Sequence, residues 1–147
     1  MEFREINKIV RNLNLYKNRV SKSHELNDTE FELVRYVSKR KSRAMNEVAE
    51  YLGVDKALVT RMSRKLESLG YIEIISDDCD KRKKLLKCLN KGFEIKDTMF
   101  DIENKYFEFI TSELSDNEKE DFLNYINKVY LKSKALRKSG FSGIDNE

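Results

Sequence analysis

The sequence predicts a mostly α-helical protein that carries one small β-hairpin. The chain of 147 residues has no proline and only 5 glycines, so few points force a helix to end. Charged residues make up 37% of the chain and hydrophobic residues 39%, which is typical of a soluble, helix-prone domain. Apolar residues recur at helical spacing along most of the chain, and two β-rich runs, residues 71–75 and 85–89, interrupt that pattern.

The first predicted helix extends from near the N-terminus to about Lys22. Its apolar residues have a spacing near 3.5 and include Phe3, Ile6, Val10, Leu13 and Val20. This stripe has too few heptads for a free coiled coil. We therefore expect the helix to pack on another surface.

A second helix is predicted after the capping residues Asn27-Asp28-Thr29-Glu30. Its apolar face would carry Phe31, Leu33, Val34 and Val37. The helix ends in the basic run Lys39-Arg40-Lys41-Ser42-Arg43. Cations at a helix C-terminus suit the helix dipole, and phosphate contact is the alternative explanation for the same run.

Residues 46–70 predict two short helices joined by a tight turn. Gly53 stands where a left-handed helix end needs a residue without Cβ, and Asp55 stands where the next helix needs a capping oxygen. The second of these helices buries a stripe formed by Val59, Met62, Leu66 and Leu69.

The opposite face of that helix is small, hydroxylated and cationic. It carries Lys56, Ala57, Thr60, Arg61 and Arg64. In a DNA major groove, Arg can bind guanine edges, while Ala and Thr methyl groups can contact thymine methyl groups. The alternative is an ordinary amphipathic helix with a solvated charged face.

The two β-rich runs favour DNA binding, because they follow this helix directly and enclose a charged loop at residues 76–84. Two strands with a charged tip after such a helix form a winged helix-turn-helix, whose tip arginine can enter the minor groove. The net charge of +3 is also uneven. Residues 32–91 hold 15 basic and 9 acidic side chains, whereas residues 92–147 hold 8 and 12.

In these features the sequence resembles the MarR/SlyA family of transcriptional regulators. The segments that carry the resemblance are Glu47-Val48-Ala49, Val59-Thr60-Arg61, residues 66–72, Asp80-Lys81-Arg82 and Leu89-Asn90-Lys91-Gly92. The resemblance implies that Arg82 reaches the minor groove while Asp80 helps to hold the wing. Two departures from the family pattern are Asn90, where Thr is usual, and Cys79, where Arg is common.

The resemblance also implies that the terminal helices form a homodimer. We expect one MarR-like domain over residues 1–147, with a DNA-binding lobe at 28–92, dimerisation helices at 1–24 and 93–138, and a frayed tail at 139–147. Ser115-Asp116-Asn117-Glu118 is a capping box that opens the last helix. The terminal helices offer more apolar surface than one small domain can bury, which favours a dimer independently.

The sequence therefore predicts a homodimeric, sequence-specific regulator that acts as a repressor on a palindromic operator. Phosphate contacts are expected from Lys39, Lys41, Arg43, Lys65, Lys81 and Lys84. The resemblance further implies a small aromatic effector. Its candidate contacts are Tyr16, Phe31, Tyr36 and Phe100.

Other kinds of function have little support in the sequence. Two cysteines and the single histidine, His24, cannot complete a four-ligand zinc site, and no glycine-rich phosphate loop exists, so we expect no metal, cofactor or catalysis. No apolar run approaches the ~20 residues of a membrane span, and the N-terminus is too polar for a signal peptide, so we expect a cytoplasmic protein. The alternatives are a redox-sensing regulator that uses Cys79 and a helical protein–protein interaction module.

Overall fold

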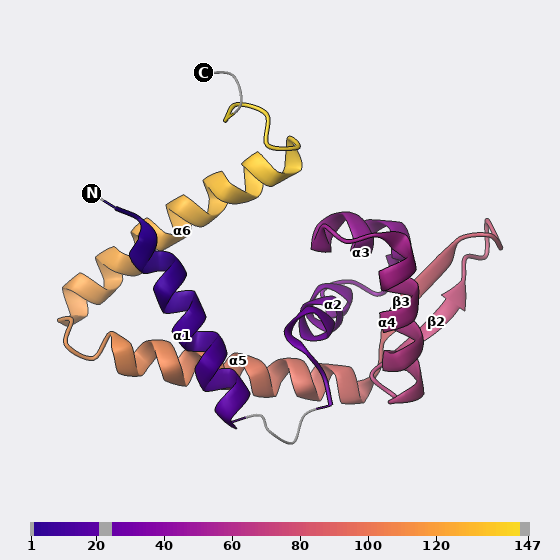
Figure 1. Cartoon of the computed structure of the whole chain (residues 1–147), viewed down its shortest axis with the longest axis horizontal. Coiled ribbons are helices and arrows are strands. Elements are labelled where there is room, and N and C mark those ends of the chain that lie inside the picture. Colours follow the sequence, from indigo (N-terminus) through magenta and orange to yellow (C-terminus); the bar gives the residue numbers. More distant parts are fainter. Residues whose placement is uncertain (1, 21–24, 145–147) are drawn as a thin grey trace. The chain divides into compact units, whose positions relative to one another are not determined.

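The computed structural model describes residues 2–20 and 25–144 and consists there of helices and one small sheet (Figure 1). The elements in chain order are α1 (Arg4–Val20), α2 (Asp28–Ser38), β1 (Arg43–Ala44), α3 (Met45–Leu52), α4 (Lys56–Ser68), β2 (Ile72–Ser76), β3 (Lys84–Cys88), α5 (Asn90–Ile110) and α6 (Asp116–Lys138). Two compact units make up the chain, residues 1–104 and residues 105–147. The predicted fold class, mostly helical with a small β-hairpin, is confirmed.

The sheet is antiparallel, and its strands lie in the order β1-β3-β2. Strands β2 and β3 pair from Ile72 opposite Cys88 to Ser76 opposite Lys84, so each predicted strand is displaced by one residue. The sequence did not predict β1, which pairs Arg43 with Leu86. Two residues are too few to show an alternating pattern.

Side-chain caps confirm two of the predicted helix starts. The N–H of Glu30 donates to Oδ1 of Asn27 over 2.9 Å, and the Glu30 carboxylate accepts the N–H of Asn27 in return. At the start of α6, the N–H of Ser115 donates to Oε2 of Glu118 over 2.8 Å. Both are capping boxes, which satisfy N–H groups that a helix start leaves without a partner.

The core of the first unit lies among α2, α3, α4, the β2–β3 hairpin and the first half of α5. Leu33, Leu66, Ile72 and Leu86 are fully buried there. Burying a side chain of this size contributes about 1.5–3 kcal/mol. The predicted apolar faces of α2 and α4 are therefore confirmed, and they fix α4 with its opposite face outward.

Helix α5 joins this core through a close approach at Gly92. A Cβ atom on Gly92 would lie 2.4 Å from the carbonyl oxygen of Tyr71 and 2.6 Å from Sγ of Cys88. Glycine is the residue that fits here without a shift of the backbone. The first turn of α5 therefore packs directly on the base of the hairpin.

Helix α1 packs on the first unit through only part of its surface. Leu13 and Lys17 are buried, whereas Val10 and Leu15 are 48% and 58% exposed. The predicted end of this helix near Lys22 lies outside the described residues.

In the second unit, α6 buries none of its described residues. The segment after α6 was predicted to fray, but its described part forms hydrogen-bonded turns, including the N–H of Phe141 to the carbonyl of Leu136 over 2.9 Å. Gly140 adopts the left-handed conformation with which a helix commonly ends, and the fraying of the tail stays a prediction.

Candidate nucleic-acid interface

The turn between α3 and α4 sets the position of α4, the candidate helix for reading DNA bases, which we call the reading helix. Gly53 has φ 66°, in the left-handed region, and the N–H of Val54 donates to the carbonyl of Ala49 over 3.1 Å. Oδ1 of Asp55 then accepts the N–H of Leu58 over 2.7 Å and caps α4. Both predicted turn residues therefore have the predicted roles.

The outward face of α4 carries the predicted reading residues. Lys56, Ala57, Arg61 and Arg64 are exposed, and Thr60 is half-buried. Within the part of the chain that the structure describes, no hydrogen bond or ion pair occupies the guanidinium of Arg61 or Arg64. Oγ1 of Thr60 donates to the carbonyl of Lys56 over 2.9 Å, which satisfies its hydroxyl within α4.

Lys65 faces another part of the lobe. Its Nζ lies 2.9 Å from Oε2 of Glu30, whose side chain is 3% exposed, and it also donates to the carbonyl of Glu25 over 3.1 Å. The predicted phosphate ligand is thus engaged by the start of α2. Sequence spacing alone could not show this, because Glu30 and Lys65 are 35 residues apart.

Arg43, another predicted phosphate ligand, is buried. Its guanidinium lies 3.9 Å from the ring centroid of Tyr36, and the ring of Tyr51 stacks on Tyr36 at 3.9 Å with an interplanar angle of 1°. Two groups this close to one ring must lie on opposite faces of it. Arg43 also forms an ion pair with Glu47 at 3.5 Å.

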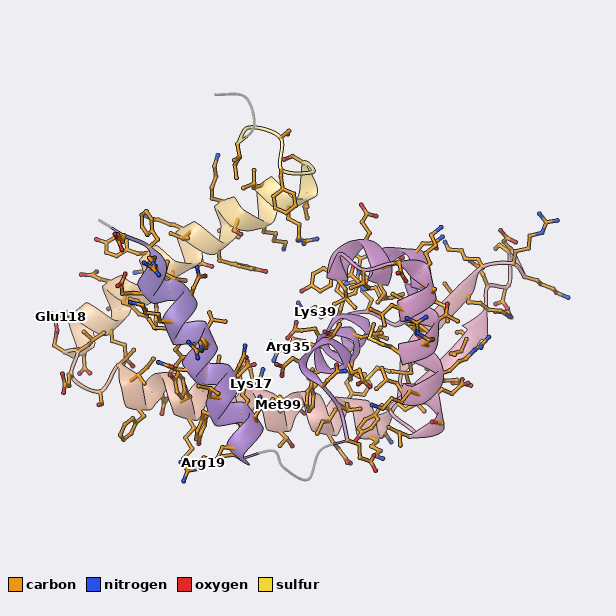
Figure 2. All side chains as sticks on the ribbon, viewed as in Figure 1. Lys17, Arg19, Arg35, Lys39, Met99 and Glu118 are labelled. Carbon is orange, nitrogen blue, oxygen red and sulfur yellow. The ribbon has the colours of Figure 1, made fainter. Side chains whose placement is uncertain are left out.

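The end of α2 nevertheless presents cations. Lys39, Arg40 and Lys41 are exposed, and Lys39 lies at the C-terminal end of α2 (Figure 2). Arg40 was not among the predicted phosphate ligands, although it belongs to the same basic run. An exposed cation between two candidate ligands is the signal that could have included it.

The wing is the β2–β3 hairpin with its loop at residues 77–83. Oδ1 of Asp80 accepts the N–H of Arg82 over 3.0 Å, and the Asp80 carbonyl accepts the N–H of Lys83 over 2.9 Å. The implied role of Asp80 in holding the wing is confirmed. Lys81, Arg82 and Lys84 are exposed, and Nζ of Lys84 donates to the hydroxyl of Ser76 over 3.0 Å.

The four predicted effector contacts occupy different environments. Phe31 is buried in the lobe core, and Tyr36 is held between Arg43 and Tyr51. Tyr16 is half-buried, whereas Phe100 is 58% exposed. Packing already uses two of the four rings, and the effector site stays a prediction.

The two cysteines also differ. Cys88 is buried on β3, as expected for a small apolar filler, and burial raises the pKa of its thiol to about 11. Cys79 is exposed in the wing loop, where its N–H donates to Oδ1 of Asp77 over 2.9 Å. His24 lies outside the described residues. Among residues 2–20 and 25–144, no helix is long and apolar enough to cross a membrane.

Comparison with known proteins agrees with this geometry. The family model for the MarR family matches residues 24–83. The HTH-type transcriptional regulator BilQ of Clostridioides difficile (strain CD3) is 30% identical over 119 residues, which cover 81% of this chain and 80% of that protein. The HTH-type transcriptional regulator SarZ of Staphylococcus haemolyticus (strain JCSC1435) is 24% identical over 108 residues, covering 74% and 72%.

Solved structures share the fold. A crystal structure of MarR superposes with a TM-score of 0.81 at 19% identity, covering 95% of each chain. A MarR protein from Peptoclostridium difficile DA00132 gives a TM-score of 0.73 at 25% identity, covering 94% of this chain and 88% of that one. The helix-turn-helix, the wing and the BilQ match together assign the chain to the MarR family of winged-helix, DNA-binding transcriptional regulators.

Proposed function

We propose that two copies of this chain bind a palindromic operator in the cytoplasm and repress transcription from it. The observation that carries this proposal is the outward face of α4, where two guanidinium groups, on Arg61 and Arg64, have no partner among the described residues. An exposed Arg pair on a helix in this position suits bidentate contacts with guanine. A bound dimer would repress by occupying DNA that the polymerase needs.

The residues proposed to contact bases differ in chemistry from those proposed to contact phosphates. Arg61 and Arg64, with the methyl groups of Ala57 and Thr60, would contact base edges in the major groove, and Lys56 would position the helix start. Arg82 would enter the adjacent minor groove from the wing. A guanidinium fork recognises base edges, whereas a flexible ammonium suits phosphate.

The proposed phosphate ligands are the exposed cations that flank α4. They are Lys39, Lys41, Lys81 and Lys84. Lys65 and Arg43 are left out, because a buried carboxylate engages Lys65 and an aromatic ring covers Arg43. The excess of basic over acidic side chains in residues 32–91, 15 against 9, supports an electrostatic contact with a polyanion.

Exposed apolar side chains support the homodimer. On α1, Ile6, Val10 and Leu15 are 49%, 48% and 58% exposed. On α6, Leu123 and Val129 are 59% and 60% exposed. Apolar surface repeated along two helices is uncommon in a soluble monomer, and a second copy of the same chain would cover it.

Selection of bound duplexes from a random DNA pool tests the proposal. We expect an inverted repeat whose half-sites lie about one helical turn apart. Arg61→Ala should then cost about 1–3 kcal/mol on the selected site and reduce discrimination against base changes there. Lys81→Ala, which removes the same charge from the wing, should weaken selected and scrambled DNA equally.

The salt dependence separates the two variants further. Lys81→Ala should make the slope of log affinity against log salt shallower by about one unit per phosphate contact, so about two per dimer. Arg82→Ala should have its largest effect on sites with A·T-rich flanks. Equal losses on selected and scrambled DNA for Arg61→Ala would exclude α4 as the reading helix. A pool without any enriched sequence would favour a protein–protein interaction module.

A further inference from the structure

One carboxylate oxygen joins three helices of the first unit. Oε1 of Glu103, on α5, accepts a hydrogen bond from Nζ of Lys17 on α1 over 3.1 Å and from Nη2 of Arg35 on α2 over 2.9 Å. Lys17 and Arg35 meet at the middle of α5, about one helical turn from the buried Met99 (Figure 2). We call these three residues the Glu103 clamp.

The clamp is largely removed from water. The side chain of Lys17 is 8% exposed, that of Glu103 19% and that of Arg35 29%. Glu32 lies 3.5 Å from Arg35, so two cations face two carboxylates. Burial lowers the pKa of Arg35, but its hydrogen bond to Glu103 and the charges of Glu32 and Glu103 outweigh this, so the net pKa is raised. A charge held in this way requires its partners, because an unpaired charge would be buried.

Contacts between α2 and α3 fix the position of the helix-turn-helix relative to α2. Tyr36, the neighbour of Arg35 on α2, stacks on Tyr51 of α3 at 3.9 Å, and α3 leads into α4 through the turn at Gly53. Buried residues of α2 and α3 also share one close-packed core, so neither helix can shift far without the other. Helices α2, α3 and α4 therefore move together, and a shift of α1 relative to α2 changes the position of Arg61 relative to α1.

Ion clusters differ from apolar contacts in what they specify. An apolar patch between α1 and α2 would bury as much surface but would tolerate sliding, whereas two hydrogen bonds on one oxygen atom fix both distance and direction. Replacing such clusters by apolar residues often preserves stability, so stability alone gives weak grounds for their presence. Fixing the relative positions of α1, α2 and α5 accounts for the clamp better than a gain in stability does.

We propose that Glu103 is a positioning residue that fixes the DNA-binding lobe relative to α1 and so sets the half-site spacing that the protein accepts. This inference rests on the proposed function, because it requires two copies of the chain on two half-sites. Each lobe would still recognise its own half-site without the clamp. Without the clamp, the distance and angle between the two reading helices would vary.

The experiment measures affinity for the selected operator and for versions with one base pair added or removed between the half-sites. Each base pair rotates the half-sites by about 35° and moves them by about 3.4 Å. The variant is Glu103→Gln, which keeps the size of the side chain and removes its charge. Asp97→Asn is the matched control, because it removes one carboxylate from an exposed position on the same helix.

The unaltered protein should prefer the selected spacing by about tenfold or more. Glu103→Gln should reduce this preference to about threefold or less, mainly through weaker binding at the selected spacing, while Asp97→Asn keeps it. Affinity for a duplex with a single half-site should stay within about twofold, which a partly unfolded lobe would not achieve. Lys17→Met, which retains an apolar stem at the buried α1 position, should flatten the spacing preference in the same way.

Two contrary outcomes have different meanings. If the unaltered protein shows no spacing preference, the proposed dimeric function is wrong, and the role of Glu103 with it. If the unaltered protein shows the preference and both Glu103→Gln and Lys17→Met retain it in folded protein, only the role of Glu103 is wrong. If Glu103→Gln lost as much affinity for the single half-site as for the selected operator, that role would also be contradicted. The clamp would then support folding of the lobe itself.

Discussion

The ammonium of Lys65, on the reading helix α4, lies 2.9 Å from the buried carboxylate of Glu30, on α2. The same carboxylate accepts the N–H of Asn27 and completes the capping box of α2. Glu30 therefore serves two elements at once: it caps its own helix and holds α4 through Lys65, which lies about one helical turn after Arg61. The orientation of Arg61 and Arg64 depends on this attachment as well as on the apolar packing of α4.

Lys65→Met should lower the free energy of unfolding by about 1–2 kcal/mol. Removing one partner of a fully buried pair costs about 3–5 kcal/mol, but Lys65 is 47% exposed, so solvent replaces part of the interaction. Denaturant unfolding gives the change. Lys56→Met on the exposed start of α4 is the matched control and should change stability by less than about 0.5 kcal/mol. A normal stability together with a shallower salt dependence of DNA binding would restore Lys65 as a phosphate ligand.

Gly92→Ala should destabilise the protein by about 1–3 kcal/mol, even though alanine is the better helix former. The added Cβ would lie 2.4 Å from the Tyr71 carbonyl oxygen, which belongs to the backbone and cannot rotate away. The double variant Gly92→Ala with Cys88→Ala removes the second clash, with the Cys88 sulfur. In thermal unfolding, the double variant should lose about the sum of the stability losses of Gly92→Ala and Cys88→Ala, because the clash with the carbonyl remains. Full recovery would mean that the carbonyl can move.

Ser63→Ala should raise the free energy of unfolding by about 0.5–1.5 kcal/mol. Ser63 is fully buried in α4, and its hydroxyl has no hydrogen-bond partner among the described residues. Removing an unsatisfied buried hydroxyl recovers part of its desolvation cost, and alanine also favours the helix. Ser68→Ala is the matched control on the same helix, because its exposed hydroxyl donates to the Lys65 carbonyl over 2.7 Å. A loss of stability in Ser63→Ala would indicate a bound water on that hydroxyl.

Cys79 should react with a disulfide reagent in the folded protein at pH 8, whereas Cys88 should react only after unfolding. Cys79 is exposed, and burial raises the Cys88 pKa from 9.0 to about 11. Because the unfolded state then loses this proton first, stability should fall as pH rises from about 9 towards 11. Cys88→Ala should lack that part of the fall in denaturant unfolding measured across this range. Equal reaction rates of both thiols would place Cys88 at the surface.

Local chemistry in the sequence determined the elements of this protein and the ends of most of them. A cap such as Asn27 with Glu30, a left-handed turn at Gly53, or an apolar stripe on α4 involves residues a few positions apart, so its spacing can be recognised in the sequence. The exposed arginines of α4 follow from the same stripe, because the face opposite a buried stripe must be exposed. That is why the reading face could be predicted.

Only the tertiary structure decided which cations remain available for DNA. Lys65 and Glu30 are 35 residues apart, and Lys17 and Glu103 are 86 apart, so no local pattern pairs them. The same holds for Arg43, which belongs to a basic run in the sequence but lies against Tyr36 in the fold. The cause is that a long, flexible cation takes whichever carboxylate or ring the packing of the helices brings within reach, and packing sets that distance after the helices have formed.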